Sequence, residues 1–209
     1  IPLIEKTEKT KNYEIVYFTF ESDRKGAVPV ILVRPKIKNI KAVVCYQHGI
    51  GEEYRKEYFL EESKILAENG IASLIIDAPF KRKGESWIEN GGIKDAEIFE
   101  NNCVEWLQLI NILPKLKVFS TNLFFVGQSY GARVAAFMPY LDNRFKKIII
   151  LSGIYNYSEW IQTTMVNQIT ELRKTITPQN FKTYINSIAP YDASLYLKKK
   201  NDVEFYFQA

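Results

Sequence analysis

The stretch of sequence that decides the fold runs from Leu123 to Ala132 and reads Leu-Phe-Phe-Val-Gly-Gln-Ser-Tyr-Gly-Ala. Its apolar start predicts a buried strand, and the residues after it read G-x-S-x-G and lead into a helical pattern. Glycine at positions 127 and 131 removes side chains that would clash in a sharp turn between strand and helix. The pattern predicts that Ser129 is a nucleophile held above a sheet edge, at the positive end of the next helix. An ordinary tight turn with an incidental serine is the alternative.

A second signal lies upstream, where residues 42–51 read Ala-Val-Val-Cys-Tyr-Gln-His-Gly-Ile-Gly. This is a buried strand that opens into a His-Gly-x-Gly loop. A nucleophilic serine needs hydrogen-bond donors aimed at the charge that develops on the substrate carbonyl oxygen. We expect the backbone N–H groups of Ile50 and Tyr130 to form this oxyanion hole, with Gly127 and Gly131 shaping the nucleophile turn.

Predicted strands alternate with predicted helices along the chain. A hairpin is expected from two strands around a glycine turn, at 13–20 and 28–34. Buried strands are expected at 42–46, 71–76, 123–126, 147–151 and 203–207, and helices at 54–69, 93–113 and 130–140. Alternation of this kind predicts an α/β fold with a mostly parallel sheet, covered by helices on both faces, after an N-terminal antiparallel hairpin.

Two of the helices show an apolar side. In the helix at 54–69 the expected inner side carries Phe59, Glu62, Ile65 and Leu66. The helix at 93–113 has a clearer stripe, made of Ala96, Phe99, Cys103, Trp106, Ile110 and Leu113.

The chain divides into three parts. Residues 1–154 form the predicted core, and 155–190 form a helical lid or insertion, because this segment is longer than one crossover needs. Residues 191–209 are expected to return to the core and to end within a sheet strand, so that a C-terminal part is absent.

Composition excludes several classes of protein. No apolar run approaches the ~18 residues of a membrane span, and no signal peptide precedes the core, which favours a cytoplasmic protein. Cys45 and Cys103 have no metal-type spacing and are expected to be buried free thiols, so neither a metal nor a cofactor is implied.

The net charge of +4 comes from scattered basic residues, which argues against nucleic-acid and membrane partners. A nucleotide-binding domain is disfavoured because G-x-G-x-x-G is missing, and a homo-oligomer stays open.

The chain resembles α/β-hydrolases, nearest to the dienelactone hydrolase, acetyl-xylan esterase and prolyl oligopeptidase-like branches. The resemblance covers residues 13–154 and resumes at 187–209. Its elements are His48-Gly49-Ile50-Gly51, Asp77-Ala78-Pro79 followed by Gly84-Glu85-Ser86, and Gly127-Gln128-Ser129-Tyr130-Gly131. The middle element departs from the family pattern, with Lys81-Arg82-Lys83 where glycine is usual. The resemblance implies a serine hydrolase that forms an acyl-enzyme.

The catalytic base is not apparent. The chain has one histidine, His48, and the resemblance implies that it pins the loop rather than faces the serine. The family order of serine, acid and histidine implies that the acid and the histidine lie beyond Ala209. Asp77 has a loop role in the family, while Asp192 and Glu159 are interpreted as surface or capping residues.

The substrate is expected to be a small ester or a short acyl compound. Tyr155 and Trp160, with Tyr130 and Tyr157 nearby, either line a substrate pocket or pack the lid onto the core. Two other functions stay open: a prolyl oligopeptidase-like peptidase or acyl-peptide hydrolase, and a non-catalytic binding protein with the hydrolase fold.

Overall fold

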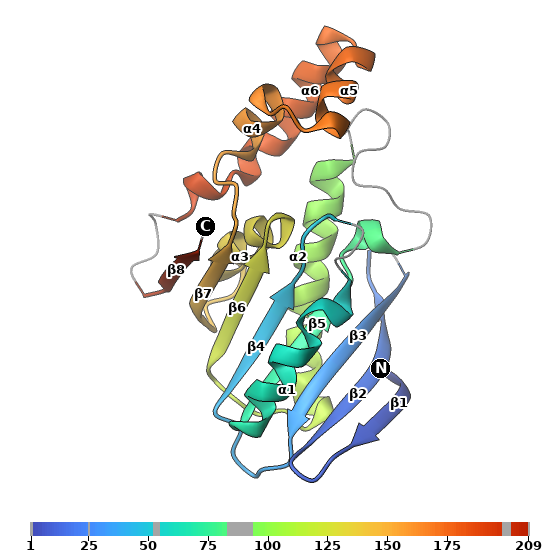
Figure 1. Cartoon of the computed structure of the whole chain (residues 1–209), viewed down its shortest axis with the longest axis vertical. Coiled ribbons are helices and arrows are strands. Elements are labelled where there is room, and N and C mark those ends of the chain that lie inside the picture. The colour runs from blue at the N-terminus through green and yellow to red at the C-terminus, as the bar shows by residue number, and fades with distance from the viewer. Residues whose placement is uncertain (1, 25, 52–54, 83–93, 198–201, 209) are drawn as a thin grey trace.

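The computed structural model describes residues 2–24, 26–51, 55–82, 94–197 and 202–208. Within these residues the chain forms one eight-stranded sheet with helices packed on it (Figure 1). The strands are β1 (Leu3–Lys9), β2 (Tyr13–Ser22), β3 (Gly26–Pro35), β4 (Ala42–Gln47), β5 (Ile71–Ile76), β6 (Leu123–Gln128), β7 (Phe145–Leu151) and β8 (Glu204–Gln208). Their order in the sheet is β1-β2-β3-β5-β4-β6-β7-β8.

The sheet has an antiparallel part and a parallel part. Strand β2 runs antiparallel to both β1 and β3, and β3 runs antiparallel to β5. From β5 through β4, β6 and β7 to β8 every pairing is parallel. The predicted α/β fold with a mostly parallel sheet is confirmed. Strand β1 was not predicted, because four of its seven residues are charged and only Leu3 and Ile4 are strongly apolar.

Helices cover both faces of the sheet. The main ones on the body are α1 (Leu60–Glu68), α2 (Asp95–Ile112) and α3 (Tyr130–Leu141). Helix α1 packs on one face in an apolar cluster with Val44 and Tyr46, whereas α2 and α3 pack on the other with Val43 and Cys45. Neighbouring residues of β4 thus face opposite sides, as the two-residue period of a strand requires. Figure 1 shows α1 and α2 on opposite sides of the strands.

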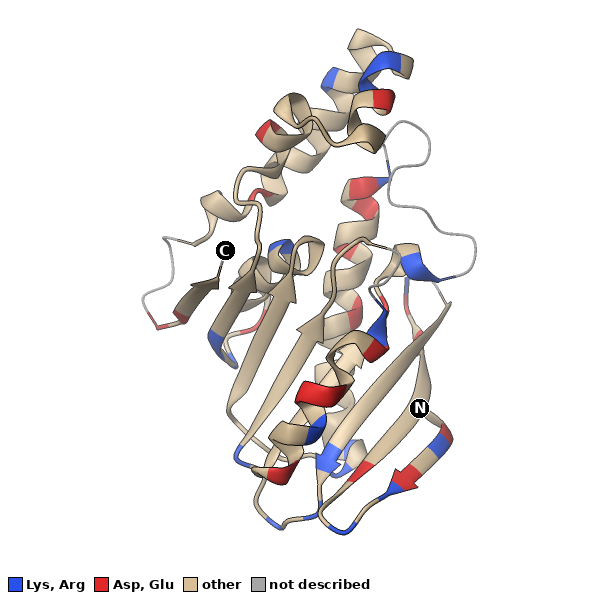
Figure 2. Ribbon diagram, in the orientation of Figure 1, with Lys and Arg blue, Asp and Glu red and all other residues tan. Residues whose placement is uncertain are grey.

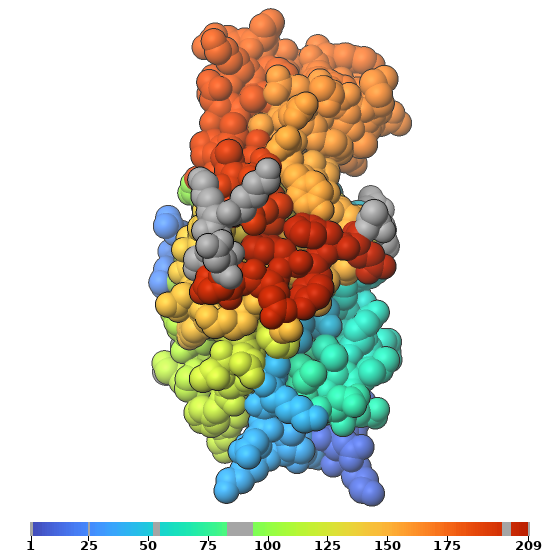
Figure 3. All heavy atoms as spheres, turned by 90° about the vertical axis from the view of Figure 1, so that its left-hand side faces the viewer, coloured from blue at the N-terminus to red at the C-terminus, as the bar shows by residue number. Residues whose placement is uncertain are grey.

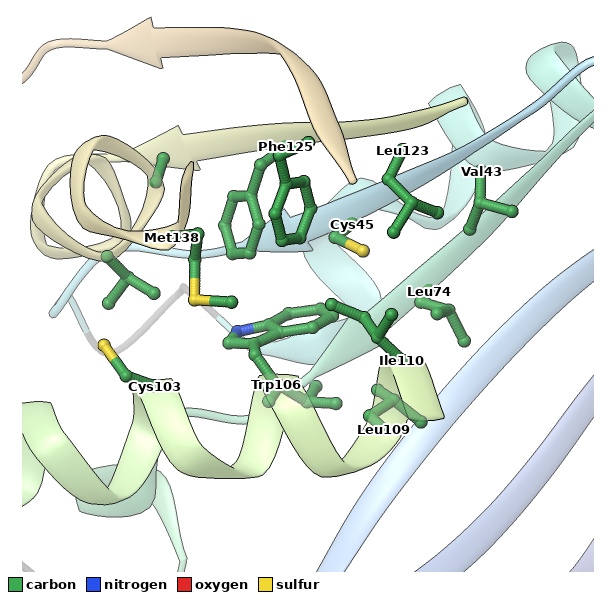
Figure 4. Packing of buried hydrophobic residues seen from close by; sticks show 14 of the residues in the cluster. Val43, Cys45, Leu74, Cys103, Trp106, Leu109, Ile110, Leu123, Phe125 and Met138 are labelled. Atoms are coloured by element: carbon green, nitrogen blue, oxygen red, sulfur yellow. The ribbon is translucent and has the colours of Figure 1, made fainter. Parts of the chain in front are cut away.

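The larger cluster is built around α2. Trp106 is fully buried and packs against Phe125 of β6, with ring centres 5.0 Å apart, while Met138 of α3 lies beside them (Figure 4). The predicted α2 stripe is confirmed at five positions, Phe99, Cys103, Trp106, Ile110 and Leu113, whereas Ala96 is half-buried. Cys45 and Cys103 are both buried free thiols.

The expected inner side of the helix at 54–69 is confirmed at Phe59, which is buried, and at Leu66, which packs against the same cluster, but it was wrong at Glu62 and Ile65. Ile65 is 62% exposed, and Ser63 and Ala67 are buried instead. The reason is a short 3₁₀ helix, η1 (Lys56–Phe59), that precedes α1. Its tighter turn rotates the side chains relative to one continuous α-helix, so the inner side changes.

Three helices follow β7. They are α4 (Tyr157–Thr163), α5 (Asn167–Thr175) and α6 (Pro178–Ile188). Thr177 caps α6 by accepting a hydrogen bond from the Asn180 N–H at 3.2 Å, and Pro178 occupies the first helical position. These helices extend beyond the carboxyl ends of β6 and β7 (Figure 1).

The strand expected at 203–207 forms as β8, but the expectation that it is buried was wrong. Within the described residues it lies at the edge of the sheet, paired with β7, and Phe207 is 53% exposed. Figure 3 shows β8 on the surface below the helices that follow β7. An apolar run of this length fits an edge strand as well as an interior one, so the sequence could not distinguish them.

Charge is distributed unevenly over the elements. Strands β4, β5 and β6 contain no charged residue, while acidic and basic side chains are mixed on β1 and α1 (Figure 2). Among the described residues, no helix combines the length and apolar character needed to cross a membrane.

Candidate active site

The turn after β6 holds Ser129 in a strained backbone conformation. Its φ is 52° and its ψ is −110°, in a region that residues with a side chain seldom occupy. Such a conformation costs on the order of 1–3 kcal/mol and persists only where the surroundings enforce it. The Ser129 N–H donates to the Leu151 carbonyl on β7 at 2.9 Å, and the Ser129 carbonyl accepts from the Ala132 N–H at 3.0 Å. The side chain is half-buried, at the start of α3.

Two glycines let the backbones meet around this serine. A Cβ atom at Gly127 would lie 2.0 Å from the Gly131 carbonyl oxygen, and one at Gly131 would lie 2.1 Å from the Gln47 carbonyl oxygen. Neither glycine has a positive φ. Their role is therefore close approach, which brings β4, β6 and α3 into direct backbone contact.

The structure brings the His-Gly-x-Gly loop to the same edge of the sheet as Ser129. Gln47, the last residue of β4, pairs with Gly127 in a parallel ladder, so residues 48–51 and Ser129 both follow the carboxyl ends of adjacent strands. Ile50 is half-buried against the larger apolar cluster. Tyr130 is the first residue of α3, so its N–H has no acceptor within the helix.

A buried network of polar side chains lies in the core next to the Ser129 turn and the end of β4. The side-chain oxygen of Gln47 accepts hydrogen bonds from Trp106 Nε1 at 2.8 Å and Asn102 Nδ2 at 3.0 Å. Asn102 Nδ2 also lies 3.4 Å from the Tyr130 hydroxyl, whose ring packs edge-on against Phe80. Sequence reasoning missed Gln47 and Asn102, although a polar residue closing an apolar strand and another inside an apolar helix stripe could have indicated them.

The Tyr130 side chain is buried in the core of the molecule. Only 3% of the residue is exposed, and burial raises the pKa of its hydroxyl well above the usual range. Its hydroxyl and ring belong to the buried network described above, and its backbone N–H is the group that faces the edge of the sheet in the expected oxyanion hole.

His48 is fully buried and both of its ring nitrogens are occupied. Nε2 accepts a hydrogen bond from the Ala78 N–H at 3.1 Å, so Nδ1 carries the proton and donates to the Gly49 carbonyl at 2.7 Å. The ring ties the loop after β4 to the segment after β5. It is therefore not available as a base for Ser129.

Asp77 organises the same segment. Its carboxylate accepts the Lys56 N–H at 2.9 Å and lies 3.2 Å from Lys56 Nζ and 3.6 Å from His48 Nε2. Burial alone would raise the pKa of this carboxyl, but the Lys56 ammonium and the Lys56 N–H oppose burial, and the pKa is lowered to about 2. Asp77 thus holds η1 against the sheet edge. Lys83 and Gly84-Glu85-Ser86 lie outside the described residues.

The remaining carboxylates and aromatics lie in or beside the three helices after β7. Asp192 is buried and caps α4, accepting the Ser158 N–H at 2.9 Å and the Ser158 hydroxyl, while Glu159 is exposed. Tyr155 is 40% exposed and its ring lies 5.7 Å from that of Phe207. Trp160 is half-buried and stacks on Tyr157.

Two further features lie apart from Ser129. An open depression of about 580 Å³ lies at the opposite end of the sheet, where Lys41, Asn122 and Leu123 are among its lining residues. It contains no residue of the Ser129 turn or the His48 loop. Within the described ranges, no group of three or more His, Cys, Asp or Glu side chains is placed to hold a metal ion.

Solved esterase structures share this architecture. Acetyl xylan esterase 1 from Thermoanaerobacterium sp. JW/SL YS485 superposes with a TM-score of 0.71 over 98% of this chain and 80% of that one, at 14% identity. Acetyl xylan esterase from Paenibacillus sp. R4 gives 0.68 over 100% and 82%, also at 14% identity. The chain has the α/β-hydrolase fold. Its relation to a cold-adapted esterase from an Arctic intertidal metagenomic library is looser, with a TM-score of 0.51 at 17% identity, over 69% of this chain and 61% of that one.

Neither a protein-family model nor a curated protein matches the chain in sequence. At these identities the structural likeness establishes the fold alone. In an α/β-hydrolase fold, a nucleophilic serine occupies a strained turn between strand and helix, and one donor of the oxyanion hole comes from a loop after a neighbouring strand. Here Ser129 lies in a strained turn between β6 and α3, and the loop at 48–51 follows the neighbouring strand β4.

Proposed function

We propose that this chain is the core of a serine hydrolase that cleaves carboxylic esters, with Ser129 as the nucleophile. The observation that carries the proposal is the strained backbone of Ser129, at φ 52° between a parallel strand and a helix. An incidental serine in an ordinary turn would relax to a common conformation, because strain of this kind is costly. The similarity to solved esterases supports the choice of an ester substrate.

The proposed chemistry is acyl transfer to water. The Ser129 Oγ attacks the ester carbonyl carbon and forms a new C–O bond, while the carbonyl oxygen becomes an oxyanion that accepts from the N–H groups of Ile50 and Tyr130. Collapse of this intermediate breaks the bond to the leaving alcohol, which takes up the proton that Ser129 gave to the base. Water then attacks the acyl carbon and gives a proton to the base. The bond between that carbon and Ser129 Oγ breaks, the base returns the proton to Ser129 Oγ, and the acid product leaves.

The general base is not His48, because backbone groups occupy both of its ring nitrogens. The sequence has no other histidine. We place the base, and the carboxylate that orients it, outside these 209 residues.

Three parts of the chain have separate proposed roles. Residues 1–154, which begin with antiparallel strands, form the catalytic core. Residues 155–190 form a lid in which Tyr155 and Trp160 contribute to a pocket for a small acyl group. Residues 191–209 return to the core, where β8 extends the sheet.

A second candidate is a non-catalytic binding protein with the same fold. The two hydrogen bonds of His48 to backbone groups favour it, because they occupy both nitrogens of the one histidine in the sequence. A peptidase is the third candidate, because esters and amides pass through the same kind of oxyanionic intermediate.

The test compares hydrolysis of p-nitrophenyl acetate with that of an acyl-peptide anilide. Both the 209-residue chain and the protein with any sequence encoded beyond Ala209 are assayed. We expect ester hydrolysis by the longer form, lost in Ser129→Ala and kept in Ser152→Ala. Ser152 is a matched control because it also has a positive φ, 48°, directly after the neighbouring strand β7. Faster anilide hydrolysis would favour the peptidase, and no turnover by the folded longer form would favour the binding protein.

A further inference from the structure

The three helices after β7 have a small apolar core of their own. It comprises Tyr157, Ile161, Ile169, Leu172, Tyr184 and Ile188. This cluster is separate from the two clusters that pack on the sheet. The lid helices therefore behave as a small packed unit, and the groups that attach this unit to the body of the molecule determine its position.

A buried polar cluster makes that attachment. Arg133 of α3 lies with Nη1 3.3 Å from the Asp95 carboxylate of α2, and the Tyr184 hydroxyl of α6 donates to the same carboxylate at 2.9 Å. The guanidinium carbon of Arg133 lies 3.6 Å from the centre of the Tyr157 ring of α4. All four residues are at most 3% exposed. The cluster thus joins two helices of the body to two helices of the lid.

Stability alone does not explain this cluster. Two nitrogens of Arg133, Nε and Nη2, have no hydrogen-bond partner within the described part of the chain. Burying unpaired donors is costly, and a buried ion pair often adds less stability than apolar side chains of similar size would. What such a pair does provide is a defined geometry, because the planar guanidinium fits one arrangement of carboxylate and ring.

The cluster connects the nucleophile helix to the proposed substrate pocket. Arg133 lies one helical turn after Ser129 in the sequence. Its partner Tyr157 stacks on Trp160, with ring centres 5.7 Å apart and ring planes 21° apart. Arg133 is therefore in contact with Tyr157, and Tyr157 is in contact with Trp160.

We propose that Arg133 is a positioning residue that fixes the lid helices relative to the Ser129 turn and so limits the size of the acyl group accepted. The second half of this inference, the limit on the size of the acyl group, rests on the proposed function. The first half, the attachment of the lid, concerns the structure alone and can be tested without turnover.

Amide hydrogen exchange tests the attachment. The variants are Arg133→Met, which removes the charge, and Tyr184→Phe, which removes one hydroxyl and is mild enough to fold if Arg133→Met does not. We expect exchange in α4, α5 and α6 to rise about fivefold in Tyr184→Phe, the effect of one lost hydrogen bond, with β4 and β6 unchanged. The control Ile169→Val shortens a side chain of the lid core that lies outside the polar cluster. Unchanged lid exchange in Tyr184→Phe, or an equal rise in lid and sheet, would overturn the proposal.

Chain-length selectivity tests the second half in the hydrolytically active form. We expect the ratio of kcat/KM for p-nitrophenyl hexanoate over the acetate to increase at least about fivefold in Tyr184→Phe, through KM, while kcat for the acetate is kept. Ile169→Val should keep the wild-type ratio. An unchanged ratio in Tyr184→Phe would refute the specificity role even if the lid loosens. If the proposed function is wrong, Ser129→Ala will keep full activity. That result would not affect the hydrogen-exchange test of the lid attachment.

Discussion

At Ser129 the backbone adopts a conformation that its neighbours enforce. The N–H is held by the Leu151 carbonyl of β7, and the carbonyl is held by the Ala132 N–H of α3. The Gly131 backbone meets the Gln47 carbonyl so closely that no side chain fits between them. These contacts come from three different elements, so the position of the hydroxyl is set by the packing of the sheet edge and not by the turn alone.

Substitution at Gly131 is predicted to be far more harmful than substitution at Gly26. In Gly131→Ala the new Cβ would lie 2.1 Å from the Gln47 carbonyl oxygen, and we expect the free energy of unfolding to fall by about 3 kcal/mol or more. Gly26 has a φ of 63° with open space around it, so Gly26→Ala should cost only about 1 kcal/mol. Urea denaturation of both variants measures this difference. Equal losses would contradict the close approach of α3 to β4.

At the scale of elements, Asp77 links the end of β5 to η1 and lies beside the loop after β4. Because its pKa is lowered to about 2 in the folded state, from about 4 when unfolded, it stabilises the fold above pH 4. That contribution, on the order of 2 kcal/mol, is lost as the pH falls from about 4 to 2.

Asp77→Asn is therefore predicted to be less stable than the wild type at pH 7, with the gap closing between pH 4 and pH 2. Thermal or urea unfolding across this pH range measures the gap. Glu61→Gln, on the exposed side of α1, is the control and should show no comparable change. A gap that stays constant down to pH 2 would show that the carboxylate charge contributes nothing at this position.

Comparison of the expected and observed strands shows which parts of the fold the sequence could predict. The G-x-S-x-G turn and the charge-free strands β4, β5 and β6 were predicted correctly, because local pattern alone determines them. Strand β1 was missed and β8 was wrongly expected to be buried, since edge strands depend on which neighbours they have. The Gln47 network and the Arg133 cluster join residues far apart in sequence, and no local periodicity reports such pairs.

At the scale of the whole molecule, the two thiols report on opening of the core. Cys45 in β4 and Cys103 in α2 belong to the same apolar cluster and are at most 2% exposed. Burial raises the pKa of both thiols above the usual range, so the reactive thiolate is scarce in the folded state. The thiols become exposed, and their pKa values return to the usual range, only when the sheet and α2 separate.

We predict that neither thiol reacts with Ellman's reagent in the native protein and that both react at the same slow rate, set by global unfolding. The single variants Cys45→Ala and Cys103→Ala allow each rate to be measured, and Thr121→Cys provides an exposed thiol that should react at once. Faster reaction of Cys103 than of Cys45 would reveal separate opening of α2 and contradict a single cooperative core.

The central claim is that Ser129 is a nucleophile, and the most direct measurement locates a covalent adduct. The protein, with any sequence encoded beyond Ala209, is treated with a fluorophosphonate, digested, and mapped by tandem mass spectrometry. We predict a single adduct on Ser129, absent from Ser129→Ala and unaffected in Ser152→Ala. An adduct on Ser152, or none on the folded protein, would contradict the claim.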